Sequence, residues 1–302
     1  MKELLGIRGI ITVLNTPFTA DDEIDVESLI RNVNEAVNAG VAGFLVPAMA
    51  SEVDKLSDAE RDVEITTVLD AVKGKIPVIG GASAATPEAR ARHARAAIDA
   101  GCDGILVNIP YEQDIQYAAE MEAIAKLDPG FLMLQDWSFS DYGIPVPLIA
   151  RLFEEIDAFR ALKIEVVPAG TKYSEVIEAT GGKLHVSGGW AVMQLIEALD
   201  RGIHAFMPTG LHYIYTKIYN LYKNDDRDAA RAFFNKILPV LAFSNQHLDI
   251  SIHFFKRFMF KRGIFSTPRI RFPILPFDSV HEKIADELID LAMALEQAAA
   301  NE

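Results

Sequence analysis

The chain has 302 residues, of which 50% are apolar and 24% charged, as in an ordinary globular protein with a large core. Its formal net charge of −14 argues against a nucleic acid or an anionic membrane surface as a partner, because both require a basic face. The single cysteine, Cys102, excludes an internal disulfide and predicts a cytoplasmic location, where thiols stay reduced.

Short apolar stretches alternate with helix-forming stretches along most of the chain. Two of the helix starts carry specific signals: Ser57-Asp-Ala-Glu60 fits a capping box, and Thr86-Pro-Glu-Ala89 places proline at the first helical position. Buried strands are predicted to begin near residues 9, 43, 76, 104, 131, 159, 183 and 204, each followed by a helix.

This strict alternation predicts an α/β protein with a parallel sheet. Eight strand–helix units favour a closed (β/α)8 TIM barrel, whose usual size is ~250 residues. A doubly wound open sheet is the alternative, and it would need a glycine-rich turn after the first strand. The chain has Asn15-Thr-Pro-Phe18 at that point, so the barrel is the better interpretation.

The alternation stops after residue 225. Three further helices are predicted, over 227–243, 248–261 and 279–299. In the second of these, Ile252, Phe255, Met259 and Phe260 share one apolar face, and Lys256 and Arg257 lie beside it. We therefore expect a barrel over residues 1–225 and a C-terminal three-helix appendage over 226–302, within one structural unit.

A lysine interrupts the apolar strand Phe159-Arg-Ala-Leu-Lys-Ile-Glu-Val-Val-Pro168. Because strand side chains alternate, Lys163 shares a face with Ala161 and Glu165. Burial lowers the pKa of a lysine, and a neutral amine can attack a ketone to form a Schiff base. The alternatives are that Lys163 reaches out to solvent or forms an ion pair with Glu165.

The position of Lys163 within the expected barrel strengthens the catalytic hypothesis. Catalytic side chains of TIM barrels come from the carboxyl ends of strands and the loops that follow. Lys75 and Lys183 precede strands, and Lys172 and Lys217 fall on helices. Only Lys163 lies inside a predicted strand near its carboxyl end, so it is the candidate for a Schiff base.

Several segments resemble the dihydrodipicolinate synthase / N-acetylneuraminate lyase family of pyruvate-dependent class I aldolases. They are Thr16-Pro-Phe18, the stretch from Gly43 to Glu52, Pro77-Val-Ile-Gly-Gly81, the Lys163 strand and Ser187-Gly-Gly189. The resemblance spans about residues 7–265. It implies an imine between Lys163 and the keto carbon of a 2-keto acid, and a homo-oligomer, either a dimer or a tetramer.

Other parts of the chain depart from the family pattern. In the family, the resemblance implies, a Gly-Thr-Thr-Gly-Glu turn binds the substrate carboxylate. The matching segment of this chain is Ala48-Met-Ala-Ser-Glu52, so only the backbone N–H groups at 49 and 50 remain for that role. The Tyr-Asn-x-Pro element, whose tyrosine shuttles protons, reads Leu134-Gln-Asp-Trp137. Of two paired tyrosines, Tyr111 remains and the other position is Glu112. The scaffold is kept while the proton relay is replaced.

A class I mechanism needs a proton-transfer group near the imine. Glu165 is the first candidate, because it lies on the face of Lys163. Trp137 and Met49 would make the pocket roomier than the family residues do, and Gly188-Gly189 offer unobstructed amides. The catalytic candidates are Lys163, Glu165, Asp136 and Tyr111, with Ser51 and Glu112 as further proton donors. The substrate-binding candidates are Ala48, Met49, Ala50, Ser51, Leu134, Trp137, Ser187, Gly188 and Gly189.

Three functions remain open. The leading one is a lyase of the aldolase type that makes or breaks a C–C bond next to pyruvate or another 2-keto acid. A dehydratase of a 2-keto-3-deoxy sugar acid would start from the same imine, and a barrel without turnover would only bind a keto acid. The altered tyrosine and threonine positions argue against the lysine-pathway synthase itself. We expect no cofactor and no metal, since the acidic run over residues 21–25 lacks the glycine and the last glutamate of a calcium loop.

Overall fold

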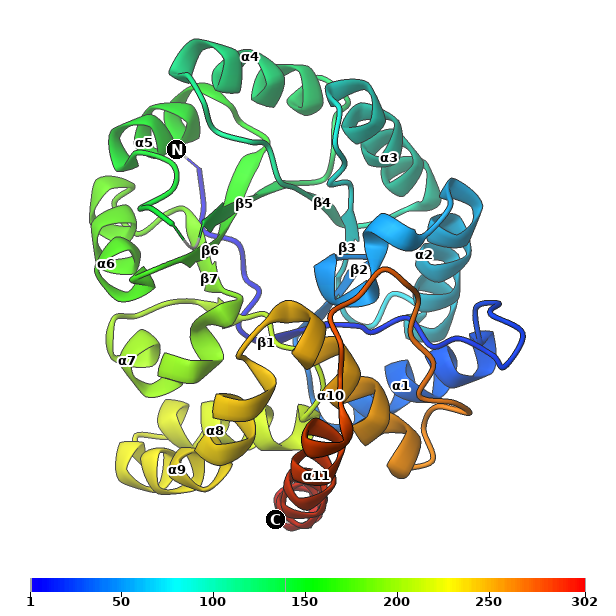
Figure 1. Cartoon of the computed structure of the whole chain (residues 1–302). Coiled ribbons are helices and arrows are strands. Elements are labelled where there is room, and N and C mark those ends of the chain that lie inside the picture. The colour runs from blue at the N-terminus through cyan, green and yellow to red at the C-terminus, as the bar shows by residue number, and fades with distance from the viewer. Residues whose placement is uncertain (1, 139, 302) are drawn as a thin grey trace. The chain divides into compact units, whose positions relative to one another are not determined.

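The computed structural model describes residues 2–138 and 140–301, and over these it confirms the predicted TIM barrel. Its parallel strands follow one another around a closed barrel in chain order, as Figure 1 shows. They are β1 (Gly9–Val13), β2 (Gly43–Val46), β3 (Val78–Gly81), β4 (Gly104–Val107), β5 (Leu132–Ser138), β6 (Phe159–Val166), β7 (His185–Gly188) and β8 (Ala205–Phe206).

Two helices between the strands begin at the predicted signals. Ser57 Oγ accepts a hydrogen bond from Glu60 N while Glu60 accepts one from Ser57 N, which closes the capping box, and Thr86 caps the helix that begins at Pro87. The α-helices are α1 (Val26–Asn38), α2 (Asp58–Val72), α3 (Pro87–Ala100), α4 (Asp114–Ala125), α5 (Val146–Glu155), α6 (Ala169–Ala179), α7 (Leu195–Asp200) and α8 (His212–Lys223). Short 3₁₀ turns are η1 (Met49–Ser51), η2 (Val53–Lys55) and η3 (Trp190–Gln194).

The chain divides into two compact units. The first unit joins the residues up to Gly9 with Pro77–Met207, and it contains β3 to β8 and α3 to α7. In this unit β5 pairs with β6 along seven positions, and the strands from β3 to β7 are almost continuously buried. Burial on both faces is expected for parallel strands that helices cover, as α3 to α6 do in Figure 1.

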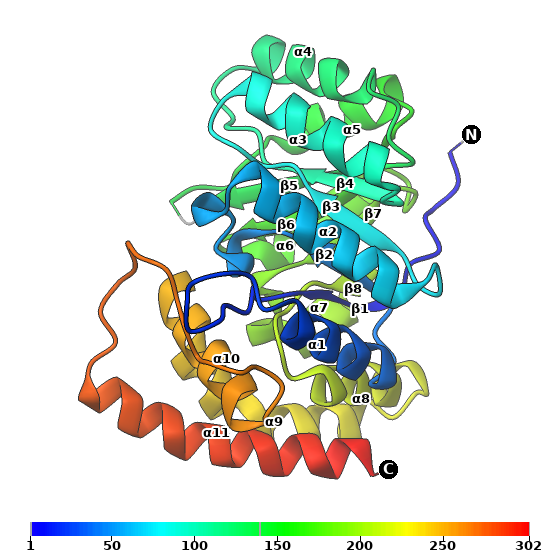
Figure 2. The same cartoon turned by 90° about the vertical axis from the view of Figure 1, so that its right-hand side faces the viewer.

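The second unit joins Ile10–Ile76 with the residues from Pro208 onward. It contains the three predicted C-terminal helices, α9 (Arg227–Ser244), α10 (Leu248–Lys261) and α11 (Ser279–Ala300). Figure 2 shows α11 running along α8 and α9. Residue 225, where the barrel was expected to end, lies between α8 and α9 inside this second unit. Although α11 has 22 residues, no helix among the described residues is long and apolar enough to cross a membrane.

The buried face of α10 differs from the predicted one. Phe260 is 44% exposed and does not join the apolar face, whereas Phe254 and Phe258 are fully buried. Lys256, which was expected beside the apolar face, is itself fully buried. Between α10 and α11, residues 264–278 form neither helix nor strand, and this segment is called the strap below.

Candidate active site

Lys163 and Glu165 form a buried ion pair on β6. Their side chains lie on one face of the strand, as the alternation predicted, and the residues are only 5% and 6% exposed. Lys163 Nζ is 3.0 Å from Glu165 Oε2. The lysine is therefore both buried, as the Schiff-base hypothesis requires, and paired with Glu165, which was one of the alternatives. At this distance the carboxylate can take the ammonium proton directly and release the neutral amine that imine formation requires.

Gln135 is the third member of this cluster. The pairing of β5 with β6 places Gln135 opposite Lys163, and Gln135 Nε2 donates a hydrogen bond to Glu165 Oε2. Leu134, the position expected to replace the family tyrosine, pairs with Leu162 and is fully buried on the other strand face. Sequence reasoning therefore missed the residue beside the ion pair. Strand alternation counted from Trp137 would have pointed to position 135, because side chains two residues apart share a face.

The end of β7 and the glycine that follows it lie against the ion pair. Ser187 pairs with Lys163, and its hydroxyl donates to Leu162 O at 3.4 Å and lies 3.3 Å from Met207 Sδ. At Gly189, an added Cβ atom would lie 2.0 Å from Glu165 Oε1 and 2.5 Å from Lys163 Cε. Gly189 has a φ of −85°, so it is required by lack of space and not by an unusual backbone.

Gly189→Ala should therefore displace the ion pair and lower turnover by about 10²-fold or more, since a shift of ~1 Å in a reacting group has effects of that size. The measurement is the rate per folded molecule, with circular dichroism to verify the fold. Gly6→Ala is the matched control, because a Cβ atom there meets nothing within 4 Å. A Gly189→Ala enzyme with an unchanged rate would contradict the closed arrangement of Gly189 against Glu165.

Asp136 lies outside this cluster. It pairs with Ile164 and so occupies the strand face opposite to Lys163. Its Oδ2 atom is 2.5 Å from Lys172 Nζ on α6, and its Oδ1 atom accepts a hydrogen bond from Ile144 N at 3.0 Å. Burial raises the pKa of Asp136 and lowers that of Lys172. Asp136 thus fastens the loop after β5 and is not brought to the imine position that the sequence hypothesis gave it.

Lys172→Met should destabilise the fold by about 3–5 kcal/mol, because it leaves the carboxylate of Asp136 buried without its cation. The double variant Lys172→Met/Asp136→Asn should recover most of that loss, since it removes both charges. Denaturant unfolding measures both effects. If Asp136 only fastens the loop, the folded double variant keeps its turnover, and a loss of turnover in that variant would return Asp136 to the chemistry.

A cavity of about 420 Å³ opens at the ends of β4 and β5. Gln135 connects it to the ion pair, and Trp137, which is 42% exposed, forms another part of its wall. Tyr111 also lines the cavity and donates a hydrogen bond to Asp114 at 2.8 Å, which raises the pKa of its phenol. Glu112, beside it, is exposed. Tyr111 and Trp137 thus line the same cavity as Gln135.

The turn over residues 48–52 belongs to the second unit and contains η1. The buried Ser51 hydroxyl donates to Leu14 O at 2.5 Å and accepts from the first N–H of the turn at 3.0 Å. Asn15 and Thr16 donate to two carbonyl groups of the turn at 2.7 and 2.6 Å. Ser51 is therefore committed to holding the turn, and the predicted binding positions Ala48, Met49, Ala50 and Ser51 form one compact segment.

A metal centre is not indicated by the geometry. Within residues 2–138 and 140–301, no group of three or more histidine, cysteine, aspartate or glutamate side chains is arranged to hold a metal ion. The chemistry that the site offers is that of a buried amine, a carboxylate in contact with it and a neighbouring amide.

The chain is similar to one family of known proteins over most of its length. The model of the dihydrodipicolinate synthetase family matches residues 6–292. An L-2-keto-3-deoxyarabonate dehydratase of Azospirillum brasilense is 27% identical, over 96% of this chain and 94% of its own. A 4-hydroxy-tetrahydrodipicolinate synthase of Salinibacter ruber is also 27% identical, over 95% of this chain and 98% of its own.

The fold agrees with these similarities. The crystal structure of a dihydrodipicolinate synthase from Rhodopseudomonas palustris superposes with a TM-score of 0.87 and covers 96% of this chain and 99% of its own, at 23% identity. The family match extends over nearly the whole chain, and the buried lysine lies on β6 where the resemblance expected it. The chain belongs to the dihydrodipicolinate synthetase family and is a lyase of the Schiff-base type that this family comprises.

Proposed function

We propose that this enzyme removes water from a 2-keto-3-deoxy sugar acid through an imine on Lys163. The observation that carries the proposal is the carboxylate of Glu165 at 3.0 Å from the Lys163 amine. Elimination requires a base close to the carbon next to the imine, and an oxygen atom in contact with Nζ is well placed for that carbon. The similarity to an L-2-keto-3-deoxyarabonate dehydratase supports the same choice.

The proposed reaction begins with formation of an imine on Lys163 and ends with its hydrolysis. The Lys163 amine adds to the keto carbon C2, and the keto oxygen leaves as water to give an iminium ion. The carboxylate of Glu165 takes a proton from C3, which forms an enamine. The enamine electron pair then expels the C4 hydroxyl group, which takes the proton from Glu165 and leaves as water. Hydrolysis of the conjugated iminium returns the amine and releases an unsaturated 2-keto acid, so one water is lost overall.

The other groups have supporting roles in this proposal. Gln135 orients the Glu165 carboxylate through its amide, and the cavity beside Gln135 has room for the hydroxylated end of the substrate.

The test is a panel of substrates with product analysis by mass spectrometry. We expect 2-keto-3-deoxy acids of five or six carbons to lose the mass of one water and to release no pyruvate. Release of pyruvate together with an aldehyde would favour the aldolase, the leading hypothesis from the sequence. Binding without any product would leave only a keto-acid-binding barrel and contradict the proposal.

Condensation of pyruvate with aspartate semialdehyde should be inefficient. No tyrosine stands at positions 134–137 to shuttle protons, and loss of a general acid or base typically costs about 10²–10⁴ in rate. Complementation of a strain that lacks the lysine-pathway synthase, at ordinary expression, would overturn this expectation.

We also infer a cytoplasmic homo-oligomer. A single cysteine suits a reducing compartment, and the resemblance to the family implies a dimer or tetramer. Light scattering of the purified protein determines the number of subunits.

A further inference from the structure

The cavity at the ends of β4 and β5 has no basic side chain in its wall, among the residues that the structure describes. The charged members of this described wall are Asp136 and Asp141. The charge of Asp136 is balanced by Lys172, which is fully buried. Asp141 is exposed, and a hydrogen bond from Gly143 N at 2.8 Å lowers the pKa of its carboxyl group. The wall therefore carries a negative charge at neutral pH.

Two tyrosines of the wall direct their hydroxyl hydrogens to carboxylates. Tyr111 donates to Asp114 at 2.8 Å, and Tyr142 donates to Glu175 Oε2 at 3.0 Å. A hydroxyl group has one hydrogen to donate and two lone pairs that accept. These tyrosines can therefore accept hydrogen bonds from a molecule in the cavity while their donors are already engaged.

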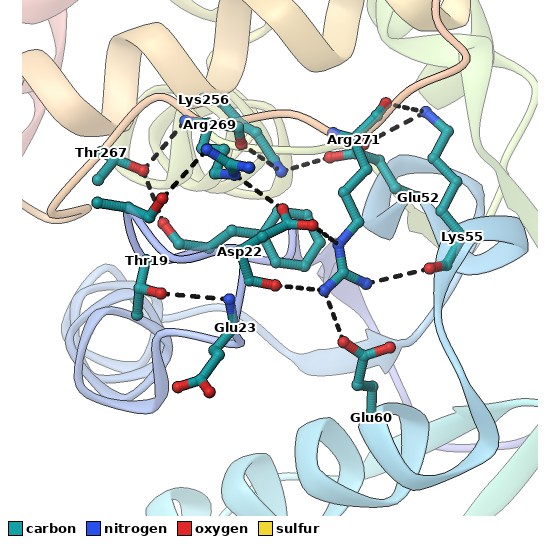
Figure 3. A network of polar contacts seen from close by, with 12 residues as sticks. Thr19, Asp22, Glu23, Glu52, Lys55, Glu60, Lys256, Thr267, Arg269 and Arg271 are labelled. Carbon is teal, nitrogen blue, oxygen red and sulfur yellow. Dashed lines mark hydrogen bonds and ion pairs between the residues drawn. The ribbon is translucent and has the colours of Figure 1, made fainter.

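The second unit shows what this chain supplies where it holds a carboxylate. The Glu52 side chain is buried, and its Oε2 atom accepts hydrogen bonds from Arg271 N of the strap at 2.8 Å and from Lys55 Nζ at 3.3 Å. Its Oε1 atom forms an ion pair with Lys256, and Figure 3 shows Glu52 among these partners. The described wall of the cavity offers no comparable cation to a carboxylate of a substrate.

The wall thus distinguishes the far ends of substrates by their charge. A carboxylate or phosphate group in the cavity would lose hydration and lie near the negative charge of Asp141. A hydroxyl group can donate to the tyrosine oxygens and to the Asp141 carboxylate. The half-exposed Trp137 ring adds apolar surface for the carbon chain. Repulsion of the wrong partner is a common source of specificity.

We propose that this cavity restricts the substrate to 2-keto-3-deoxy acids whose far end is an uncharged polyol, and that Asp141 is a specificity-determining residue. Acids with a second carboxylate and phosphorylated acids are then excluded. This inference rests on the proposed function, which places the far end of the substrate in the cavity beside Gln135. Gln135 joins the cavity to the reacting groups, because it lines the wall and also donates to Glu165.

The first measurement compares two 2-keto acids of five carbons that differ at their far end. 2-Ketoglutarate ends in a carboxylate and 2-ketopentanoate in a methyl group, and neither has a C4 hydroxyl group to lose. Borohydride trapping on Lys163 is followed against the concentration of each acid, and binding of the shared keto-acid end cancels in the ratio. The concentration for half-maximal trapping should be about tenfold or more higher for 2-ketoglutarate, because its second carboxylate meets a like charge and no cation.

Asp141→Asn should lower this ratio by roughly two- to fivefold, because it removes the repelling charge at an exposed position. Asparagine keeps an oxygen atom that can accept the hydrogen bond from Gly143 N. Asp128→Asn is the matched control. It removes the same charge from an exposed turn before β5 in the same unit, where the left-handed backbone also suits asparagine, and it should leave the ratio unchanged.

Turnover extends the comparison to the substrates themselves. Of two 2-keto-3-deoxy acids of six carbons, the one that ends in a hydroxymethyl group should have a kcat/KM about tenfold or more above that of the one that ends in a carboxylate. Equal trapping of the two five-carbon acids, or an unchanged ratio in Asp141→Asn, would overturn the inference. The expected ratio without loss of water from either deoxy acid would contradict dehydration alone. Absence of any trapping would overturn the imine function and this inference with it.

Discussion

Lys163→Arg should abolish borohydride trapping of a 2-keto acid and lower turnover by a factor on the order of 10⁴ or more, as removal of a nucleophile does. Among the described residues, Lys163 is the only lysine within a barrel strand, and its amine has a proton acceptor at 3.0 Å. Arginine keeps the positive charge beside Glu165, but a guanidinium group does not form an imine. Mass spectrometry of the reduced protein should show one adduct per chain, and peptide mapping should place it on Lys163.

Arginine is a better replacement than alanine at this position. Removal of a buried amine that had no partner would cost the fold little. The ion pair changes this expectation, because Lys163→Ala leaves the buried carboxylate of Glu165 with Gln135 as its remaining partner in the cluster. A folded Lys163→Arg chain separates lost chemistry from lost stability. An adduct on Lys172 or Lys256, the other buried lysines bound to carboxylates, would contradict the assignment.

The periodicity of the sequence was sufficient to predict the barrel. Apolar runs of strand length alternate with capped helices, and α10 spans the residues that its pattern predicted. The apolar run near residue 131 did not indicate how far β5 continues, through Gln135, Asp136 and Trp137 to Ser138. These side chains are polar or aromatic, and it is their pairing with β6 that makes them a strand. The local sequence pattern does not show which residues of β5 pair with β6.

The candidate site was predictable only where local geometry sufficed. Lys163 and Glu165 share a face because strand side chains alternate, so their proximity followed from the sequence. Asp136 has equally suitable chemistry, yet its partner is Lys172 on the following helix, and that contact depends on tertiary packing. The buried pair of Lys256 with Glu52 is of the same kind. On an amphipathic helix a lysine beside the apolar face is usually solvated, and here its burial depends on the Glu52 carboxylate and the Arg269 carbonyl group.

Glu165→Gln should lower turnover by roughly 10²–10⁴, the range for a lost acid/base group, while leaving the fold intact. The amide oxygen of glutamine can still accept hydrogen bonds from Lys163 and Gln135, so the buried contacts are kept. Trapping of pyruvate should persist at long incubation, because the amine is still present. Turnover of a 2-keto-3-deoxy acid and the extent of trapping are therefore measured on the same preparation.

A difference between the effect on turnover and the effect on trapping identifies the role of Glu165. A group that only stabilises the fold would lower both through loss of folded protein, whereas a base for C3 lowers turnover after the imine has formed. Glu155→Gln, on the exposed surface of α5 where Glu155 pairs with Arg151 at 3.3 Å, is the matched control and should change neither. An unaltered turnover of Glu165→Gln would remove this carboxylate from the reaction. In that case the double variant Lys172→Met/Asp136→Asn decides whether Asp136, which pairs with Lys172 and lines the same cavity as Gln135, serves instead.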